Sequence, residues 1–305
     1  MIATRESYGK ALAELGEKYK DVVVLDADLA NATKTIEFKK KFPERFFDIG
    51  IAEQDLIGTA AGLALGGKIP FASTFAVFAS GRAYDQVRNT VAYSKLNVKI
   101  AATHAGITVG EDGASHQALE DISLMRSIPN MLVCSPADDR CTKWLIEEAI
   151  KYNGPMYIRL ARPATEEIYS NDVKFELGKG IQHGHGKDAT IFATGVTVAE
   201  ALKAKEILKQ KNIDVRVVDM HTIKPIDKEL IVKCANETDK LYTVEDHSII
   251  GGLGSAVCEV LCDSAPKKVT RIGINDEFGQ SGKWQELMAY YGITAEKIAE
   301  RIIKE

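Results

Sequence analysis

Short runs of apolar residues alternate with amphipathic stretches along most of the chain. In the first half, apolar runs of strand length lie at residues 22–26, 69–74, 98–103, 131–135 and 156–160. Because these runs are apolar throughout, they are typical of strands buried on both faces of a parallel sheet. Between them, residues 4–20, 54–65, 76–94 and 138–152 carry apolar positions at helical spacing, and Thr4 is expected to cap the first helix. The pattern predicts an α/β domain with a mostly parallel sheet.

The pattern is interrupted between residues 163 and 188, where the chain is polar and contains four glycines. We expect a linker there, with a short strand near Phe175–Leu177. Strands are then expected at 189–193, 213–219, 240–245 and 268–274, and helices at 197–211, 227–236, 253–263 and 294–304. A length of 305 residues is enough for two domains, so the second half is predicted to be a smaller α/β domain.

Composition and charge exclude several classes of protein. The formal net charge is -4 and no basic block carries interleaved aromatic residues, so nucleic-acid binding is not expected. The longest weakly polar run, 56–67, is about half of what spans a bilayer, and the N-terminus lacks the apolar core of a signal peptide. The five cysteines include no C-x-x-C pair, so we expect small buried hydrophobes and a cytoplasmic protein.

Glu53 is the first candidate for chemistry. It follows the strand-like piece 45–50 and begins a helix of small and apolar residues. An acid in a first helical turn is favoured by the helix dipole, which gives a purely structural interpretation. The helix is apolar nearly all round, however, and a buried carboxyl must be paired with a cation or keep its proton. The sequence leaves both interpretations open.

Two further segments follow predicted strands, whose carboxyl ends are where ligands bind in open parallel sheets. Phe75 and Phe78 either line a cleft there or belong to the core. The glycine-rich segment 103–117 presents His104, Glu111, Asp112 and His116, and is either an active-site loop or a solvated charged loop. The two histidines lack helical ligand spacing and no cysteine is near, so no metal site is predicted in this chain.

Taken together, these segments resemble the C-terminal half of a transketolase. The matching pieces, in chain order, are 25–35 (LDADLANATKT), 48–67, 73–78 (STFAVF), 103–131, 219–227 (DMHTIKPID), 251–257 and 278–282 (FGQSG). The most specific is GEDG-x-S-H-Q at 110–117, followed by IPNM at 128–131. The resemblance implies a pyrimidine-binding domain at 1–165, a linker at 166–184 and a transketolase C-terminal domain at 185–305.

A transketolase also carries a diphosphate-binding domain with a GDG motif, and this chain shows none. Its one Asp-Gly pair, Asp112-Gly113, belongs to the GEDG loop. The chain is therefore expected to be either a fragment or one subunit of a split enzyme, and its start at Met1 with a capped helix favours the second. The resemblance implies thiamin diphosphate as cofactor, with Mg²⁺ (or Ca²⁺ or Mn²⁺) held mainly by an N-terminal transketolase subunit that has the diphosphate-binding domain. The expected assembly is a heterotetramer with two copies of each subunit.

The resemblance also implies roles for residues of this chain near the cofactor. Glu53 is the acid that faces the aminopyrimidine, and Phe75 and Phe78 are walls for its ring. Asp28 resembles the family's Asp near the cofactor and the boundary between subunits.

For the substrate, Asp112 and His116 match positions that contact hydroxyls near the carbon–carbon bond that is cleaved, and His116 is also a catalytic candidate. Arg5, His104 and Arg162 match the cationic rim that holds a sugar phosphate. Ala32 stands where the family often has Ser, so a sulfonate in place of the phosphate stays open.

The implied reaction moves a two-carbon ketol unit from a ketose phosphate to an aldose phosphate, as in the pentose phosphate pathway. Four alternatives stay open, one of them a free-standing α/β binding protein without cofactor, which predicts a closed monomer. A 1-deoxyxylulose-5-phosphate synthase has the same domain order but typically a different loop, and a 2-oxo acid dehydrogenase beta subunit has this length but lacks the GEDG loop. A non-catalytic assembly partner would be expected to lose the acid at Glu53, which is present. The split enzyme predicts an exposed apolar face where its partner binds.

Overall fold

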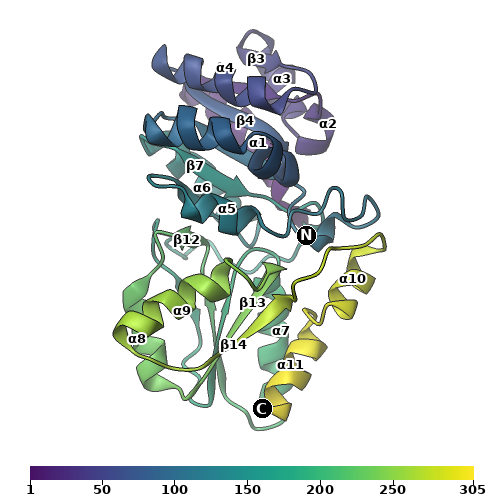
Figure 1. Cartoon of the computed structure of the whole chain (residues 1–305), viewed down its shortest axis with the longest axis vertical. Helices are drawn as coiled ribbons and strands as arrows, with labels where there is room; N and C mark the ends of the chain where they lie inside the picture. The colour runs from purple at the N-terminus through teal and green to yellow at the C-terminus, as the bar shows by residue number, and fades with distance from the viewer.

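A seven-stranded sheet forms the core of the first half in this computed structural model, which describes all residues 1–305 (Figure 1). Its strand order is β12-β6-β7-β5-β4-β2-β3, and every pairing is parallel except that of β12 with β6. The strands are β2 (Val22–Asp26), β3 (Phe46–Asp48), β4 (Ile69–Phe75), β5 (Lys99–Thr103), β6 (Leu132–Cys134), β7 (Met156–Arg159) and β12 (Thr222–Lys224). The predicted parallel strands are therefore confirmed, to within one or two residues at each end.

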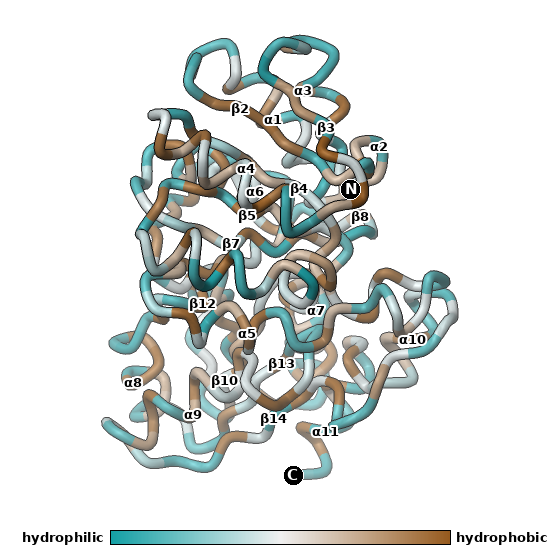
Figure 2. The backbone as a smooth tube through the Cα atoms, turned by 45° about the horizontal axis from the view of Figure 1, so that its top comes forward, coloured by the Kyte–Doolittle hydropathy of each residue, from teal (hydrophilic) through white to brown (hydrophobic).

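Helices cover both faces of this sheet because successive strand residues point to opposite sides. Val22 and Val24 pack toward α1 (Thr4–Lys18), α3 (Ile36–Lys41) and α6 (Asp139–Lys151). Val23 and Leu25 pack toward α4 (Glu53–Leu65) and α5 (Asp121–Ser127). Figure 2 shows β2 in brown, as expected of an apolar strand between two layers. The remaining short helices are α2 (Ala30–Thr33) and the 3-10 turns η1 (Pro43–Arg45) and η4 (Ile107–Val109).

Two local predictions for this half are wrong. Thr4 does not cap α1, because it is the first helical residue and its hydroxyl accepts a hydrogen bond from the amide of Ala161 at 2.8 Å. The single helix expected over 76–94 is instead broken into two π-helical segments, η2 (Phe78–Arg82) and η3 (Gln86–Tyr93). π-Helical turns change which residues share a face and are frequent at functional sites.

The second half is a smaller layered unit around a five-stranded sheet. Its order is β14-β13-β10-β11-β9, parallel except for β9. The strands are β9 (Ile181–His183), β10 (Ala189–Ala193), β11 (Val215–Asp219), β13 (Lys240–Ser248) and β14 (Val269–Ile274). Helices α7 (Thr197–Lys209) and α11 (Ala295–Lys304) cover one face, and α8 (Lys228–Glu237) and α9 (Leu253–Ser264) cover the other. The fold class is thus two α/β units with mostly parallel sheets.

The polar stretch between the two sheets differs from the expectation. Phe175–Leu177 forms no strand; its Phe175 ring stacks on Trp144 with ring centroids 5.1 Å apart. Two short strands lie in the stretch instead: β8 (Ala164–Thr165), which pairs with β1 (Ile2–Ala3), and β9. Helix α10 (Trp284–Tyr290) was also not anticipated.

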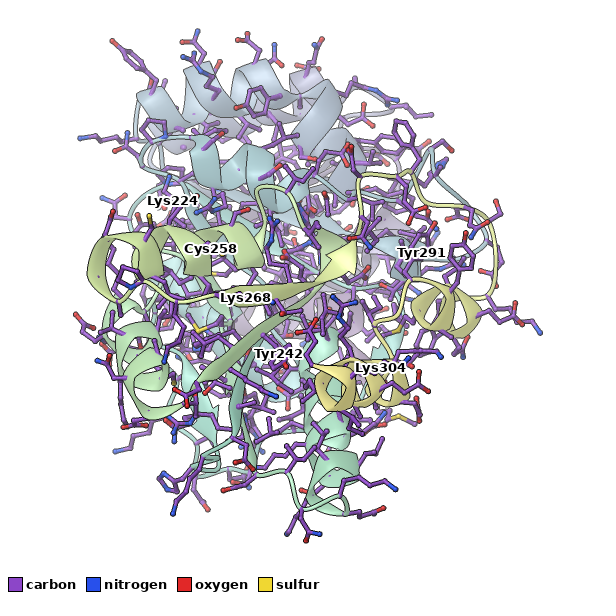
Figure 3. All side chains as sticks on the ribbon, turned by 60° about the horizontal axis from the view of Figure 1, so that its bottom comes forward. Lys224, Tyr242, Cys258, Lys268, Tyr291 and Lys304 are labelled. Carbon is purple, nitrogen blue, oxygen red and sulfur yellow. The ribbon has the colours of Figure 1, made fainter.

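The two sheets are joined by more than the chain between them. β12 comes from the second half but pairs with β6 of the first sheet. Lys224, labelled in Figure 3, donates to the carbonyls of Arg126 at 2.9 Å and Ile128 at 2.5 Å. The pairing of β12 with β6 and the Lys224 hydrogen bonds therefore fix the position of the second unit relative to the first.

All five cysteines are free thiols, although Cys258 is half-buried and Cys262 is exposed, so the expectation that all are buried is wrong for these two. No helix has the length and apolarity needed to cross a membrane.

Candidate active site

The carboxyl ends of three neighbouring strands bring the candidate residues to one edge of the seven-stranded sheet. β2 pairs with β4 at Asp26 and Ser73, and β4 pairs with β5 at Phe75 and Thr103. Asp28, Phe78 and His104 come directly after these strands. The structure therefore places the three segments where an open parallel sheet binds ligands.

Glu53 is buried at the first turn of α4, with 2% of its surface exposed. Both of its carboxylate oxygens lie 3.0 Å from Nη1 of Arg82. The predicted burial of this acid is confirmed, and of the two ways expected to compensate a buried carboxyl the structure shows the ion pair. Arg82 ends the π-helical turn η2, and its guanidinium carbon lies 4.5 Å from the centroid of the Phe78 ring. One planar cation thus contacts both the acid and the aromatic ring.

Phe75 and Phe78 are partly stacked, with ring centroids 5.9 Å apart and an angle of 14° between the planes. His104 stacks on Phe75 at 3.9 Å, and His116 meets the edge of Phe78 at 5.5 Å. Phe75 is buried whereas Phe78 is half-buried, so Phe78 is the ring that a ligand reaches. The four rings form a continuous aromatic wall next to Glu53 and Arg82.

The three residues expected to form an anion-binding rim lie together. Arg5 donates from Nε to the carbonyl of Arg162 at 3.2 Å, and its Nη1 lies 3.4 Å from Nε2 of His104. Nη1 of Arg5 also donates to the carbonyl of Ala32 at 2.8 Å.

His104 contributes no positive charge to this rim in the isolated chain. Burial, together with the charges of Arg5 and Arg162, lowers the pKa of His104 to about 3. Its imidazole is therefore neutral near pH 7, and the rim is cationic through the two arginines alone. A neutral ring still offers an N–H donor to an anion.

The GEDG loop carries Asp112 and His116 beside this rim. Nη1 of Arg162 lies 3.4 Å from Glu111 and 3.9 Å from Asp112, and it also donates to the carbonyl of Val109. Asp112 is exposed and His116 is half-buried, with its Nδ1 2.9 Å from the hydroxyl of Ser115. Both side chains are available to a ligand at the edge of the aromatic wall.

Asp28 stands apart from this group. It is exposed, adopts a left-handed backbone conformation (φ 59°), and its carboxylate makes no hydrogen bond or ion pair in the chain. Its amide donates to Asp48 at 3.2 Å. The neighbouring Asp26 organises the segment, because its buried carboxylate accepts from Leu29, Thr33 and Thr35; burial raises the pKa of Asp26 to about 6.

Two parts of the site were not anticipated from the sequence. Arg82 could have been sought, because a buried acid needs a cation, but nothing along the chain selects it among the other arginines. The second part is the role of the FGQSG turn at 278–282, which resembles transketolases in sequence and here supports the GEDG loop: Nε2 of Gln117 donates to the carbonyl of Gln280 at 3.0 Å. A cavity of about 270 Å³ opens beside this contact, lined in part by Val77, Gln117 and Phe278. No group of three or more His, Cys, Asp or Glu side chains is arranged to hold a metal ion.

Known families match both halves of the chain. The family described as transketolase, pyrimidine binding domain, matches residues 1–167, and the family described as transketolase, C-terminal domain, matches residues 178–298. The chain belongs to the transketolase family. Both matches agree with the observed pair of α/β units.

Individual relatives of this transketolase-family chain include proteins of similar length. It is 58% identical over 304 residues to a putative transketolase C-terminal section of Methanocaldococcus jannaschii, a match that covers 99% of this chain and 95% of that protein. It is 41% identical over 305 residues to one subunit of an apulose-4-phosphate transketolase of Phocaeicola vulgatus, covering 100% of this chain and 97% of that protein. A solved structure described as a split gene transketolase, inactive beta4 tetramer, superposes with a TM-score of 0.93 at 54% identity, covering 100% of this chain and 98% of that chain.

Arg82 is expected to stabilise the isolated chain through Glu53. Arg82→Ala removes the one cation that contacts this buried carboxylate, so we expect a loss of about 1–2 kcal/mol in the free energy of unfolding. Urea denaturation of the isolated chain measures the loss. Arg88→Ala is the control, because Arg88 is an exposed arginine of η3 and its replacement is expected to cost almost nothing. In a Glu53→Gln background the effect of Arg82→Ala should shrink; an undiminished loss would contradict the pairing.

Proposed function

We propose that this chain is the C-terminal subunit of a two-chain transketolase and moves a two-carbon ketol unit from a ketose phosphate to an aldose phosphate. Its pyrimidine-binding domain comprises residues 1–165, followed by a linker at 166–184 and the transketolase C-terminal domain at 185–305. The observation that carries the proposal is the buried Glu53 carboxylate beside the half-buried ring of Phe78. A cytoplasmic enzyme is the corresponding expectation for its compartment.

The residues present fit the aminopyrimidine of thiamin diphosphate. Arg82 shows that one flat, nitrogen-bearing group can lie on the Phe78 ring and at the same time reach both oxygens of Glu53. An aminopyrimidine has the same properties, because it is planar and carries ring nitrogens and an amino group. Glu53, Phe75 and Phe78 would hold this ring, with Asp28 near the boundary between subunits.

Thiamin diphosphate supplies the carbanion chemistry of ketol transfer when it is bound. Glu53 of this chain would share a proton with N1′ of the bound aminopyrimidine in place of its contact with Arg82, and general acid–base help of this kind contributes about 10²–10⁴-fold. Asp112 and His116 orient the substrate hydroxyls, with His116 also placed to hold a proton. Arg5 and Arg162 bind the terminal phosphate through their guanidinium donors, and His104 adds a neutral donor.

A partner subunit is needed to hold the diphosphate and the metal, Mg²⁺ in the first instance. The chain offers no cluster of metal ligands of its own. Large apolar side chains are exposed near the start and end of α4, with Ile51 78% and Leu65 76% exposed, as expected of a surface that a partner covers. The similar beta4 tetramer is described as inactive, which also favours a requirement for a second kind of subunit. We propose a heterotetramer with two copies of each subunit.

The decisive experiment combines this chain with the N-terminal transketolase subunit of the same source. Ketol transfer from xylulose 5-phosphate to ribose 5-phosphate is measured with thiamin diphosphate and Mg²⁺, for the mixture and for each chain alone. We expect transfer only in the mixture.

Two outcomes would contradict the proposal. A folded complex that binds thiamin diphosphate but transfers no ketol unit would overturn the sugar-phosphate assignment. Turnover of pyruvate by that complex would instead favour a 1-deoxyxylulose-5-phosphate synthase-like or 2-oxo acid dehydrogenase-type reaction. A separate assay uses a donor that carries a sulfonate in place of the phosphate. It tests whether Ala32, which stands where the family often has Ser, accompanies a different anion on the substrate.

A further inference from the structure

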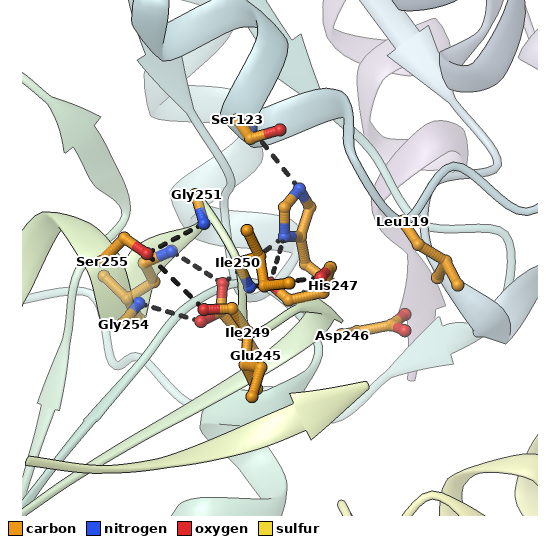
Figure 4. A network of polar contacts seen from close by, with 12 residues as sticks. Leu119, Ser123, Glu245, Asp246, His247, Ile249, Ile250, Gly251, Gly254 and Ser255 are labelled. Atoms are coloured by element: carbon orange, nitrogen blue, oxygen red, sulfur yellow. Dashed lines mark hydrogen bonds and ion pairs between the residues drawn. The ribbon is translucent and has the colours of Figure 1, made fainter. Parts of the chain in front are cut away.

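Three consecutive side chains near the end of β13 have different partners, and Figure 4 shows the contacts of Glu245 and His247, with Asp246 pointing away from both. Glu245 accepts hydrogen bonds from the amides of Leu253 at 2.7 Å and Gly254 at 2.8 Å, so the glycine-rich turn that opens α9 already binds a carboxylate of its own chain. His247 accepts from the amide of Ser123 in α5 at 3.4 Å. Asp246 points to the opposite side of the strand, as the alternation of side chains requires.

Asp246 holds the loop that follows β5. Its Oδ1 accepts from the amide of Ile107 at 2.8 Å, and its Oδ2 accepts from the hydroxyl of Thr108 at 2.9 Å. The carboxylate is 2% exposed, so water does not compete for these bonds. Ile107 lies three residues after His104 and five before Asp112, which places the contact between two proposed substrate-binding residues.

Asp246 is itself fixed to the first sheet. Nη2 of Arg159, at the end of β7, donates to the carbonyl of Asp246 at 2.7 Å. Nε of the same arginine donates to Asp121 at 2.9 Å, and Asp121 begins α5 at the far end of the GEDG loop. The loop therefore has a rigid support on both sides, and that support includes a strand of the second unit.

We infer that Asp246 is a positioning residue that sets the substrate-binding loop 104–117 for ketol transfer. This inference rests on the proposed function, and it gives the C-terminal domain an indirect part in substrate binding, through the loop, although that domain contributes no residue to the aromatic wall. Glu53, Phe75 and Phe78 lie on α4, β4 and the turn after β4, outside the loop. Since His104 and His116 of the loop also contact these Phe rings, loss of the Asp246 contacts is expected to affect the substrate first and the cofactor less.

The first test uses amide hydrogen exchange in the isolated chain. We expect Asp246→Ala to accelerate exchange of Ile107 and its loop neighbours at least about tenfold, because the amide loses its buried acceptor. If Asp246→Ala does not fold, Thr108→Val takes its place, because it removes only the hydroxyl that bonds Asp246. Asp219→Asn is the matched control, since Asp219 is a buried acid of β11 that binds the hydroxyl of Tyr169 and not the loop.

The second test uses the complex with the partner subunit. We expect Thr108→Val and Asp246→Ala to lower kcat/KM for xylulose 5-phosphate by about tenfold to a hundredfold, because small displacements of binding groups have effects of this size. KM for the donor should rise by a larger factor than the Kd of thiamin diphosphate, and Asp246→Asn should restore part of the activity by keeping one oxygen acceptor.

Two results would overturn the inference: unchanged loop exchange in folded variants, or equal effects of Asp219→Asn on the loop and on the donor KM. If the wild-type complex transfers no ketol unit, the proposed function fails, yet hydrogen exchange still decides whether Asp246 holds the loop.

Discussion

Replacing Glu53 with Gln is expected to lower kcat for ketol transfer by the two-chain complex about 10²–10⁴-fold. Gln has the same shape and can still accept a hydrogen bond, but its amide cannot take up or release a proton. The side chain is buried at the first turn of α4 and cannot be replaced by a water molecule or a neighbouring acid. Because the substitution is isosteric, the free energy of unfolding should change much less than the activity does.

The measurement separates catalysis from binding. Steady-state kinetics of the Glu53→Gln complex is compared with the affinity for thiamin diphosphate, obtained by titrating the cofactor's optical signal. Asp55→Asn is the matched control, since Asp55 is an exposed acid of the same helical turn that bonds only Thr59, at 3.2 Å. An unchanged kcat in Glu53→Gln would remove the central residue of the proposed site, whereas a loss in Asp55→Asn of the same size would point to the helix N-terminus instead.

The sheets could be predicted from the sequence because their strands are buried on both faces. The runs 22–26 and 189–193 coincide with β2 and β10, and each is apolar and bounded by polar or glycine-containing segments. Short elements could not be predicted in this way. β12 and α10 have too few residues for a periodic signal, and β12 is a strand only because it pairs with β6.

Candidate positions could also be found, but the contacts between them could not. Glu53 and the GEDG loop were located from local composition and from resemblance to transketolases. Their partners are distant in the chain: Arg82 lies 29 residues after Glu53, and Asp246 lies 138 residues after Thr108. Thr4 shows the same limit, because its hydroxyl accepts a hydrogen bond from the amide of Ala161, 157 residues away, and does not cap its own helix. Hydrogen-bonding capacity is visible in a sequence, whereas the tertiary partner that uses it is not.

Gly106→Ala is expected to reduce the free energy of unfolding of the isolated chain by about 2–5 kcal/mol. Gly106 has φ 76° and ψ -173°, a conformation that residues with a side chain rarely adopt. A Cβ added there would collide with the carboxylate of Asp246. Gly50→Ala is the control, because Gly50 has the same φ and no atom within 4 Å of an added Cβ, so its loss should be about 1–2 kcal/mol.

Urea denaturation measures how much the collision with Asp246 contributes to the loss of stability. Four chains are compared: wild type, Gly106→Ala, Asp246→Ala and the double variant. Removing the carboxylate leaves space for the added methyl group, so Gly106→Ala should cost less in the Asp246→Ala background than in the wild type. If backbone strain alone were responsible, Gly106→Ala would cost the same free energy of unfolding in the wild type and in the Asp246→Ala background. If Gly106→Ala cost no more than Gly50→Ala, there would be no collision between the added Cβ and Asp246. The close approach of a glycine backbone to a buried acid is then what allows a strand of the C-terminal domain to hold a loop of the pyrimidine-binding domain.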